Sequence, residues 1–261
     1  MNIVRKIAAA TLAALAALPA VAQDGSAARA LQDPLANISA LITDNTVVFN
    51  QGANKDQTGY DFQLQPVYAI PTSFGLNFIP RAVVPIVGQP QADNSTNWGL
   101  GDVILQSFVS PKSDSSIKWG VGPQVSLKTR NEGRLGGPGW GAGLAGVVVA
   151  TNTGDWSLAG IVNHLWAEDG FSVTTVNPVV YYNFPSGNGW FAAYNNNITY
   201  DWKADSGQQW TVPVGLTVGK ALELGNGYGL ELSVGGYRLA KSPTGAGDTQ
   251  AKFGVSVVFP R

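Results

Sequence analysis

The chain has 261 residues, of which 44% are hydrophobic and only 13% are charged, whereas soluble domains average about 25% charged residues. Its formal net charge of -1 gives no basic surface for nucleic acid, which is therefore not expected as a partner. Cysteine is absent and His164 is the single histidine, which excludes thiolate sites and histidine-rich metal centres; no metal or other cofactor is expected.

The first residues predict export. Arg5 and Lys6 precede an apolar run that ends at Leu18, and residues 20–22 (AVA) form a small-residue cleavage site. This order is typical of a secretory signal peptide, because a spanning helix needs about 20 apolar residues. We expect residues 1–22 to be removed. Residues 23–44 then form an N-terminal segment that plugs a lumen, lies in the periplasm or is disordered, and residues 45–261 form one folded domain.

Most of the mature sequence alternates between apolar and polar residues. In residues 60–68 the apolar row begins at Tyr60 and ends at Tyr68, while Asp61, Gln63 and Gln65 point the other way. Comparable candidate strands occupy residues 46–51, 75–87, 99–109, 118–128, 140–150, 156–166, 172–184, 190–202, 210–218, 228–239 and 250–259. The total of about twelve is even, as single-chain bacterial outer-membrane barrels require, and many candidates are long enough to cross a bilayer.

Two environments fit such strands: the apolar row faces either a protein core, in a secreted sandwich, or lipid, in a barrel. The apolar rows of the most regular candidates, residues 60–68, 119–127, 210–218 and 251–259, contain no charged residue. A charge on the lipid face costs about 2–4 kcal/mol. All tryptophans lie at or next to the ends of candidate strands, as in the aromatic girdles of membrane barrels. They are Trp98, Trp119, Trp140, Trp156, Trp166, Trp190, Trp202 and Trp210. The sequence thus favours an all-β, antiparallel transmembrane β-barrel of about twelve strands over the sandwich.

Polar residues on the opposite rows are candidates for lining the lumen. The acidic and basic ones among them are equal in number, so they form either a selective polar constriction or paired charges that only stabilise the barrel. The candidates are Asp61, Arg81, Asp102, Lys118, Lys128, Asn195, Asn197, Asp201, Glu231, Tyr237 and Lys252. Tyr181 is also predicted to point inward. Arg238 falls on the apolar row unless a bulge near Gly235 shifts the register or the residue lies above the membrane.

Two motifs suggest chemistry, but neither is convincing. Residues 141–146 (GAGLAG) match a dinucleotide-binding string, yet no βαβ unit surrounds them. Asn163 and His164 invite comparison with barrel lipases that use Ser, His and Asn. However, neighbouring strand residues face opposite sides, so Asn163 cannot orient the ring of His164, which we place at a strand end. We therefore predict no catalytic residue and no enzyme.

Several short strings resemble a family of bacterial outer-membrane transporter-like proteins. They occupy residues 99–102 (GLGD), 119–123 (WGVGP), 162–166 (VNHLW), 199–202 (TYDW), 209–213 (QWTVP) and 258–260 (VFP). The family is named for the meta-pathway of phenol degradation, and some of its members are mislabelled "neuromedin U". The resemblance covers nearly the whole mature chain and implies an outer-membrane barrel that passes small compounds, but it assigns no site residue. The chain ends in Pro260-Arg261, whereas barrel assembly signals usually end in an aromatic residue; Phe259 is the candidate substitute.

We expect a channel or transporter-like barrel in the bacterial outer membrane, for passive passage of small compounds, aromatic or hydrophobic ones among them. The expected partners are outer-membrane lipid, a small solute and the barrel assembly machinery. The alternative is a structural or adhesive barrel with a closed lumen and partner-binding loops, and the third reading is a barrel-embedded lipid hydrolase. With a periplasmic N-terminus, residues 87–97, 130–139 and 240–248 are outer loops, and residues 151–155 and 185–189 are periplasmic turns.

Overall fold

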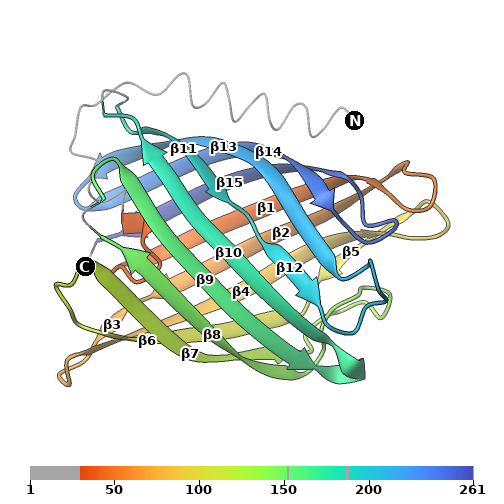
Figure 1. Cartoon of the computed structure of the whole chain (residues 1–261), viewed down its shortest axis with the longest axis horizontal. Coiled ribbons are helices and arrows are strands. Elements are labelled where there is room, and N and C mark those ends of the chain that lie inside the picture. The colour runs from red at the N-terminus through yellow and green to blue at the C-terminus, as the bar shows by residue number, and fades with distance from the viewer. Residues whose placement is uncertain (1–29, 152, 186–187, 261) are drawn as a thin grey trace.

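The computed structural model describes residues 30–151, 153–185 and 188–260, so the expected signal peptide lies outside the described residues. One antiparallel sheet contains all the strands (Figure 1). The strands are β1 (Ser39–Gln51), β2 (Gln57–Tyr68), β3 (Ile70–Pro71), β4 (Leu76–Pro90), β5 (Thr96–Leu100), β6 (Val103–Pro111), β7 (Ile117–Leu127), β8 (Gly141–Ala150), β9 (Trp156–Ala167), β10 (Ser172–Asn183), β11 (Trp190–Asn195), β12 (Ile198–Asp201), β13 (Trp210–Gly225), β14 (Tyr228–Lys241) and β15 (Thr249–Phe259).

The sheet closes on itself because β1 pairs with both β2 and β15, and β9 pairs with both β8 and β10. Three strands of the barrel are interrupted and carry two labels each: β2 with β3, β5 with β6, and β11 with β12. The barrel therefore has twelve strands. The predicted antiparallel barrel is confirmed, and the alternative sandwich is wrong. None of the helices in the described part of the chain is long and apolar enough to cross a membrane.

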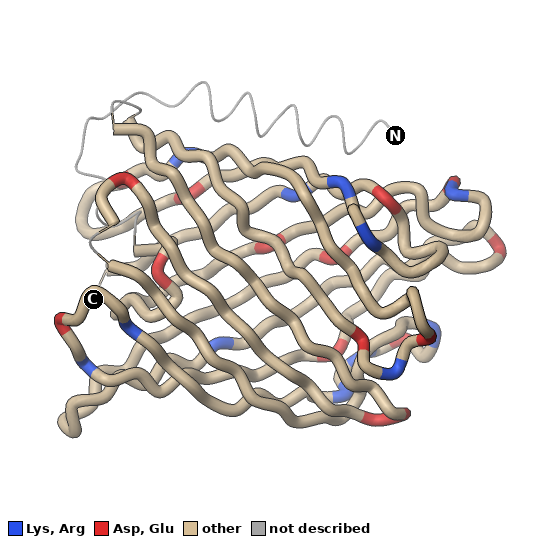
Figure 2. Tube along the Cα trace, viewed as in Figure 1, with Lys and Arg blue, Asp and Glu red and all other residues tan. Residues whose placement is uncertain are grey.

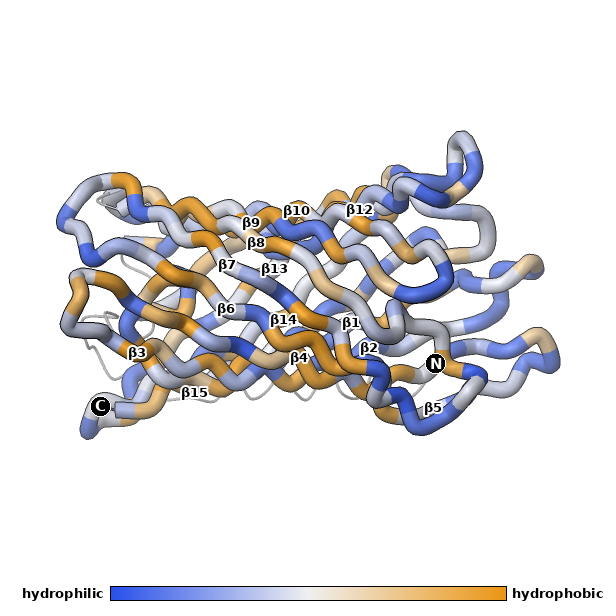
Figure 3. The backbone as a smooth tube through the Cα atoms, turned by 90° about the horizontal axis from the view of Figure 1, so that it is seen from below, coloured by the Kyte–Doolittle hydropathy of each residue, from blue (hydrophilic) through white to orange (hydrophobic). Residues whose placement is uncertain are grey.

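The apolar rows face outward and the polar rows face inward. On the outer surface Val121 is 53% exposed and Leu144 is 63% exposed, whereas Gln124 and Ser126, on the inner row of β7, are 3% and 0% exposed. Figure 3 shows the alternation along the strands and the hydrophilic loops opposite the C-terminus. Since charged and amide side chains fill the interior while aliphatic ones cover the outside, the wall is built to meet lipid.

The loops divide between two ends. The end that carries residues 52–56, 91–95, 128–140, 202–209 and 242–248 is called the loop end, and the end where residues 30–38 and Pro260 lie is called the terminal end. Figure 2 shows charged residues at both ends of the barrel and several more along its length. Each tryptophan lies at or beside a strand end, as expected: Trp156 begins β9 and Trp202 follows β12, for example. Seven of the eight are 43–61% exposed.

Two details of the wall differ from a plain alternating pattern. β1 begins at Ser39, upstream of the boundary expected at residue 45. Residues 141–146 lie at the start of β8, where a Cβ on Gly143 would overlap the carbonyl oxygen of His164. The glycines therefore serve the close approach of β8 to β9, not nucleotide binding.

Candidate functional site

Residues 30–38 cross the interior of the barrel at the terminal end. The short 3-10 helix η1 (Ala30–Gln32) begins this segment. The Gln32 amide donates to Asn183 on β10 at 3.0 Å, and its carbonyl oxygen accepts from Ser157 on β9 at 2.7 Å. Leu35, which is 4% exposed, packs in a cluster with Ile79 and other residues of the inner wall. The segment thus spans from one side of the barrel to the other, and residues 30–38 are called the plug for this position.

The cluster around Leu35 makes the terminal end apolar. Its other members are Ala69, Ile79, Phe108, Ala145, Val147, Val149 and Ile161. These residues lie on inward rows where a channel would be polar, and they are at most 8% exposed. Sequence reasoning left the role of residues 23–44 open because the inward apolar partners of Leu35 come from β4, β6, β8 and β9, which only barrel closure brings together.

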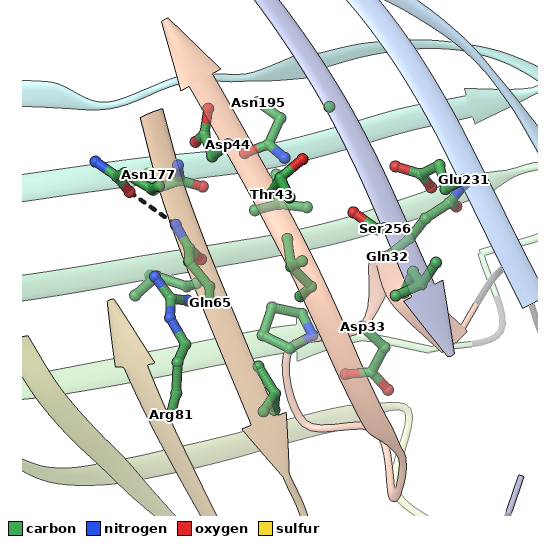
Figure 4. Close-up of a pocket in the computed structure, with 18 of the residues that line it drawn as sticks. Gln32, Asp33, Thr43, Asp44, Gln65, Arg81, Asn177, Asn195, Glu231 and Ser256 are labelled. Atoms are coloured by element: carbon green, nitrogen blue, oxygen red, sulfur yellow. Dashed lines mark hydrogen bonds between the residues drawn. The ribbon is translucent and has the colours of Figure 1, made fainter. Parts of the chain in front are cut away.

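A cavity of about 180 Å³ lies inside the barrel, between the plug and the loop end. Polar side chains from around the wall converge on it, among them Arg81, Asn195 and Glu231 (Figure 4). Ile79, Phe108 and Tyr181 add apolar and aromatic surface to the same cavity. Several buried polar atoms at or beside the cavity make no hydrogen bond within the described residues, among them Arg81 Nε, Glu231 Oε2 and Asp61 Oδ1. The cavity therefore offers both aromatic contact and unused hydrogen-bonding groups.

The structure brings five of the predicted lumen residues together at this cavity: Arg81, Asn195, Asn197, Glu231 and Lys252. Asp61 lies beside them, because Gln63, which lines the cavity, donates to its carboxylate at 2.8 Å. Tyr237 is 3% exposed, and its hydroxyl is 2.8 Å from the hydroxyl of Thr217, another cavity residue.

The remaining candidates lie toward the ends. Asp102 sits at the interruption between β5 and β6, and Lys128 follows β7 at the rim of the loop end. Asp201 closes β12 at the same end and accepts from the Lys203 backbone N–H at 2.9 Å. Lys118 lies near the start of β7, at the terminal end, where its charge acts on Asp33 of the plug. These four residues are not among those that line the cavity.

The charged candidates pair with residues that sequence reasoning did not select. Lys252 Nζ lies 2.8 Å from an Asp44 carboxylate oxygen, and Arg130 lies 3.2 Å from Asp102. Lys128 lies 2.6 Å from Glu168, and this hydrogen bond holds the pKa of the Glu168 carboxyl below its usual range. The partners are distant in sequence, so no local spacing could reveal them. Lys252 is therefore in an ion pair, whereas Arg81 Nε has no hydrogen-bond partner within the described residues.

His164 faces outward at the loop end, in a small polar network on the barrel wall. Its Nδ1 is 2.7 Å from the Thr174 hydroxyl and its Nε2 is 3.2 Å from the Ser172 hydroxyl. Trp202 Nε1 donates to the same Thr174 oxygen at 2.9 Å. The expectation that Asn163 does not orient this ring holds, since Asn163 lines the inner cavity. Ser172 is only 7% exposed, which places its hydroxyl beneath the surface, away from a lipid carbonyl.

Other outward charges are held at the ends. Arg238 is exposed near the loop end of β14, and from Gly235 to Arg238 the registers with β13 and β15 are both continuous. The bulge considered near Gly235 is therefore absent, and the arginine lies at the rim. Lys220 lies 5.6 Å from the centre of the Trp190 ring, a cation–π contact at the terminal end. Among the described residues, no group of three or more His, Asp or Glu side chains is placed to hold a metal ion.

No protein-family model and no curated protein matches the chain. The resemblance to the phenol-degradation family therefore stays a prediction. Among solved structures, the chain is similar to an outer membrane channel from Pseudomonas putida F1, with a TM-score of 0.60, 13% identity and coverage of 85% of this chain and 96% of that one. It also matches an outer membrane phospholipase from Salmonella typhi, with a TM-score of 0.43, 14% identity and coverage of 92% and 99%. A porin variant from Rh. blastica gives a TM-score of 0.28 at 12% identity, with coverage of 85% and 99%. The first of these likenesses shows that the chain has the fold of an outer-membrane β-barrel.

Proposed function

We propose that this chain is an outer-membrane channel for passive passage of small compounds, aromatic or hydrophobic ones among them. The observation that carries the proposal is a closed barrel with an internal cavity of about 180 Å³. An engineered cavity of about 150 Å³ is enough to hold benzene. A single-ring compound therefore fits the space.

The lining of the cavity supports this choice of solute. Phe108 and Tyr181 offer ring surface to an aromatic compound. Asn195 and Asn197 can hydrogen-bond a hydroxyl or carbonyl substituent. A lining that mixes ring surface with amide groups suits small aromatic compounds, with or without one polar group.

The proposed location is the outer membrane, with the terminal end in the periplasm. Export through a cleaved signal peptide and insertion by the barrel assembly machinery are parts of the same proposal. Phe259 ends β15 and is 41% exposed on the outer face, where an aromatic assembly signal would be read. We also propose that the chain is not an enzyme. Ser172, the hydroxyl residue beside His164, is only 7% exposed, which keeps it from a lipid substrate.

One observation favours a second candidate, a structural barrel with a closed lumen: the plug fills the terminal end with apolar side chains. Uptake separates the two. Cells with an intact outer membrane would express the chain, and entry of radiolabelled toluene would be compared with vector-bearing cells. Ser233→Phe fills the cavity, whereas Leu216→Phe adds the same ring on the lipid face, where Leu216 is 53% exposed. The channel function predicts that toluene enters cells with the wild-type chain or Leu216→Phe faster than vector-bearing cells. In cells with Ser233→Phe, entry is expected to fall to the vector rate. Entry at the vector rate from a folded wild-type barrel would establish the closed structural barrel instead.

A further inference from the structure

Arg81 is a cation of the inner cavity that pairs with no carboxylate in the described part of the chain. It lies on the inward row of β4, opposite Val67 of β2 and Gln106 of β6. Its Nε is buried and has no hydrogen-bond partner. Gln106, its neighbour across the ladder, donates its amide to Gln124 at 3.2 Å. A guanidinium stays charged inside a protein, so a buried one without an anion is costly.

The carboxylates around the cavity do not balance this charge. The charge of Asp44 acts on Arg81, but both carboxylate oxygens of Asp44 contact Lys252 Nζ, at 2.8 and 3.1 Å. Glu231 lies across the cavity from Arg81 (Figure 4) and is 7% exposed. A carboxyl group can lose its charge by binding a proton, whereas a guanidinium cannot. Among the described groups of the cavity, the standing charge that a solute can balance is therefore positive.

Ring surface lies close to this cation. Phe108 is the next inward residue after Gln106 on β6, and it faces Ile79, the inward neighbour of Arg81 on β4. Phe108, Ile79 and Tyr181 all line the cavity. The volume of about 180 Å³ exceeds the roughly 150 Å³ that holds benzene, which leaves room for one substituent on a ring. A flat solute can therefore contact aromatic surface while a charged substituent reaches the guanidinium.

We propose, on the basis of the channel function above, that the cavity is a binding site for small aromatic monocarboxylates, and that Arg81 selects them. Two N–H groups of a guanidinium match the two oxygens of a carboxylate, which gives a bidentate ion pair. The ring of the same solute packs against Phe108 and Ile79. Benzamide has nearly the shape of benzoate but no charge, so it keeps the ring contacts and loses the ion pair. Acetate keeps the ion pair and loses the ring contacts.

Calorimetric titration of the purified wild-type barrel in detergent tests the site. Benzoate is expected to bind more tightly than benzamide or acetate. Arg81→Met is expected to weaken benzoate binding on the order of 10- to 100-fold, the range for hydrogen bonds to a charged group, and to leave benzamide binding unchanged. Arg81→Lys keeps the charge without the bidentate geometry, so a smaller preference for benzoate is expected to remain. Arg238→Met is the matched control, because it removes an exposed arginine at the rim, outside the cavity.

Heat unfolding separates this role from a structural one. Arg81→Met is expected to be at least as heat-resistant as the wild-type barrel without solute, because it removes an unpaired buried charge. Benzoate is expected to raise the unfolding temperature of the wild-type barrel and of Arg238→Met, since a solute that binds only the folded state stabilises it. The same benzoate concentration is expected to leave Arg81→Met unchanged.

Three results overturn the carboxylate site: equal affinity of the wild-type barrel for benzoate and benzamide, wild-type benzoate affinity in Arg81→Met, or an Arg81→Met barrel that unfolds below the wild-type temperature. If Arg81→Met gives no folded barrel, Arg81→Lys decides, and an undiminished preference for benzoate in that variant overturns the site. Toluene carries no charge, so its entry into cells tests the channel function separately. Toluene entry above the vector level with no preference for benzoate overturns this site alone, whereas entry at the vector level overturns the channel function.

Discussion

Replacing Leu35 with alanine is expected to open the lumen at the terminal end. Leu35 is 4% exposed and packs against Ile79, Phe108 and Val147, which are 1%, 2% and 2% exposed. Replacing a buried leucine with alanine costs about 2.7–5 kcal/mol. We take about 3 kcal/mol, because residues 30–38 can shift to fill part of the space. At about 1.4 kcal/mol per tenfold change, the undocked fraction of the plug rises on the order of 100-fold.

Two measurements check this expectation. Single-channel recording is expected to show more frequent or longer openings, and proteoliposomes are expected to swell faster in arabinose. Leu64→Ala is the control, since it makes the same deletion on the lipid face, where Leu64 is 43% exposed. Both variants must first show the wild-type shift in electrophoretic mobility on boiling. A folded Leu35→Ala barrel with wild-type conductance and swelling would refute the claim that this segment closes the terminal end.

Further predictions concern the wall, the rim and the outer surface. Lys252→Met is expected to lower the free energy of unfolding by about 3 kcal/mol, because Asp44 is left without its cation, and Asp44→Asn in the same chain is expected to restore most of it in urea titrations in detergent. Gly143→Ala is expected to prevent folding because its Cβ meets the His164 carbonyl, whereas Gly160→Ala, with no atom within 4 Å of its Cβ, leaves the heat-modifiable band unchanged. The lowered pKa of Glu168 means that its contact with Lys128 is complete above the unfolded value of about 4.3 and is lost as the pH falls through the lower folded value. The protection of residues 128–140 against hydrogen exchange, taken relative to the unfolded-peptide rate at each pH, is expected to fall with it, and protection that stays constant below about pH 4 would contradict this reasoning. His164→Ala is expected to leave deacylation of phospholipid vesicles at the rate of the wild-type chain and of empty vesicles, and an activity lost in this variant would show that the chain is an enzyme.

The strands could be predicted from the sequence because lipid and lumen impose opposite chemistry on alternate residues. The same rule explains what was missed. In the first half of β1 the outward row contains Thr43 and Asn45, whose side chains bond β15 across the closing seam: the Thr43 hydroxyl donates to Val255 O at 2.9 Å, and the Asn45 amide donates to Phe253 O at 3.0 Å. Polar residues on the outer row hide the strand from a pattern search.

The lumen was only partly predictable. Inward rows identify residues such as Arg81 and Glu231, since each strand fixes its own faces. The pairing of Lys252 with Asp44, and of Lys128 with Glu168, depends on which strands become neighbours when the barrel closes and on how the loops fold over the rim. The position of the plug also depends on closure, because the cluster that contains Leu35 takes its members from strands between β4 and β9.

Fractionation of cells, followed by electrophoresis with and without boiling, tests the central claim most directly. A barrel whose apolar row faces lipid must sediment with the outer membrane, resist detergent and change mobility when boiled. The account predicts this shift in the outer-membrane fraction, together with toluene entry above the vector level in the same cells. A soluble periplasmic protein that shows no shift would contradict the account, because the outward apolar rows would then have no lipid to face and no channel could form.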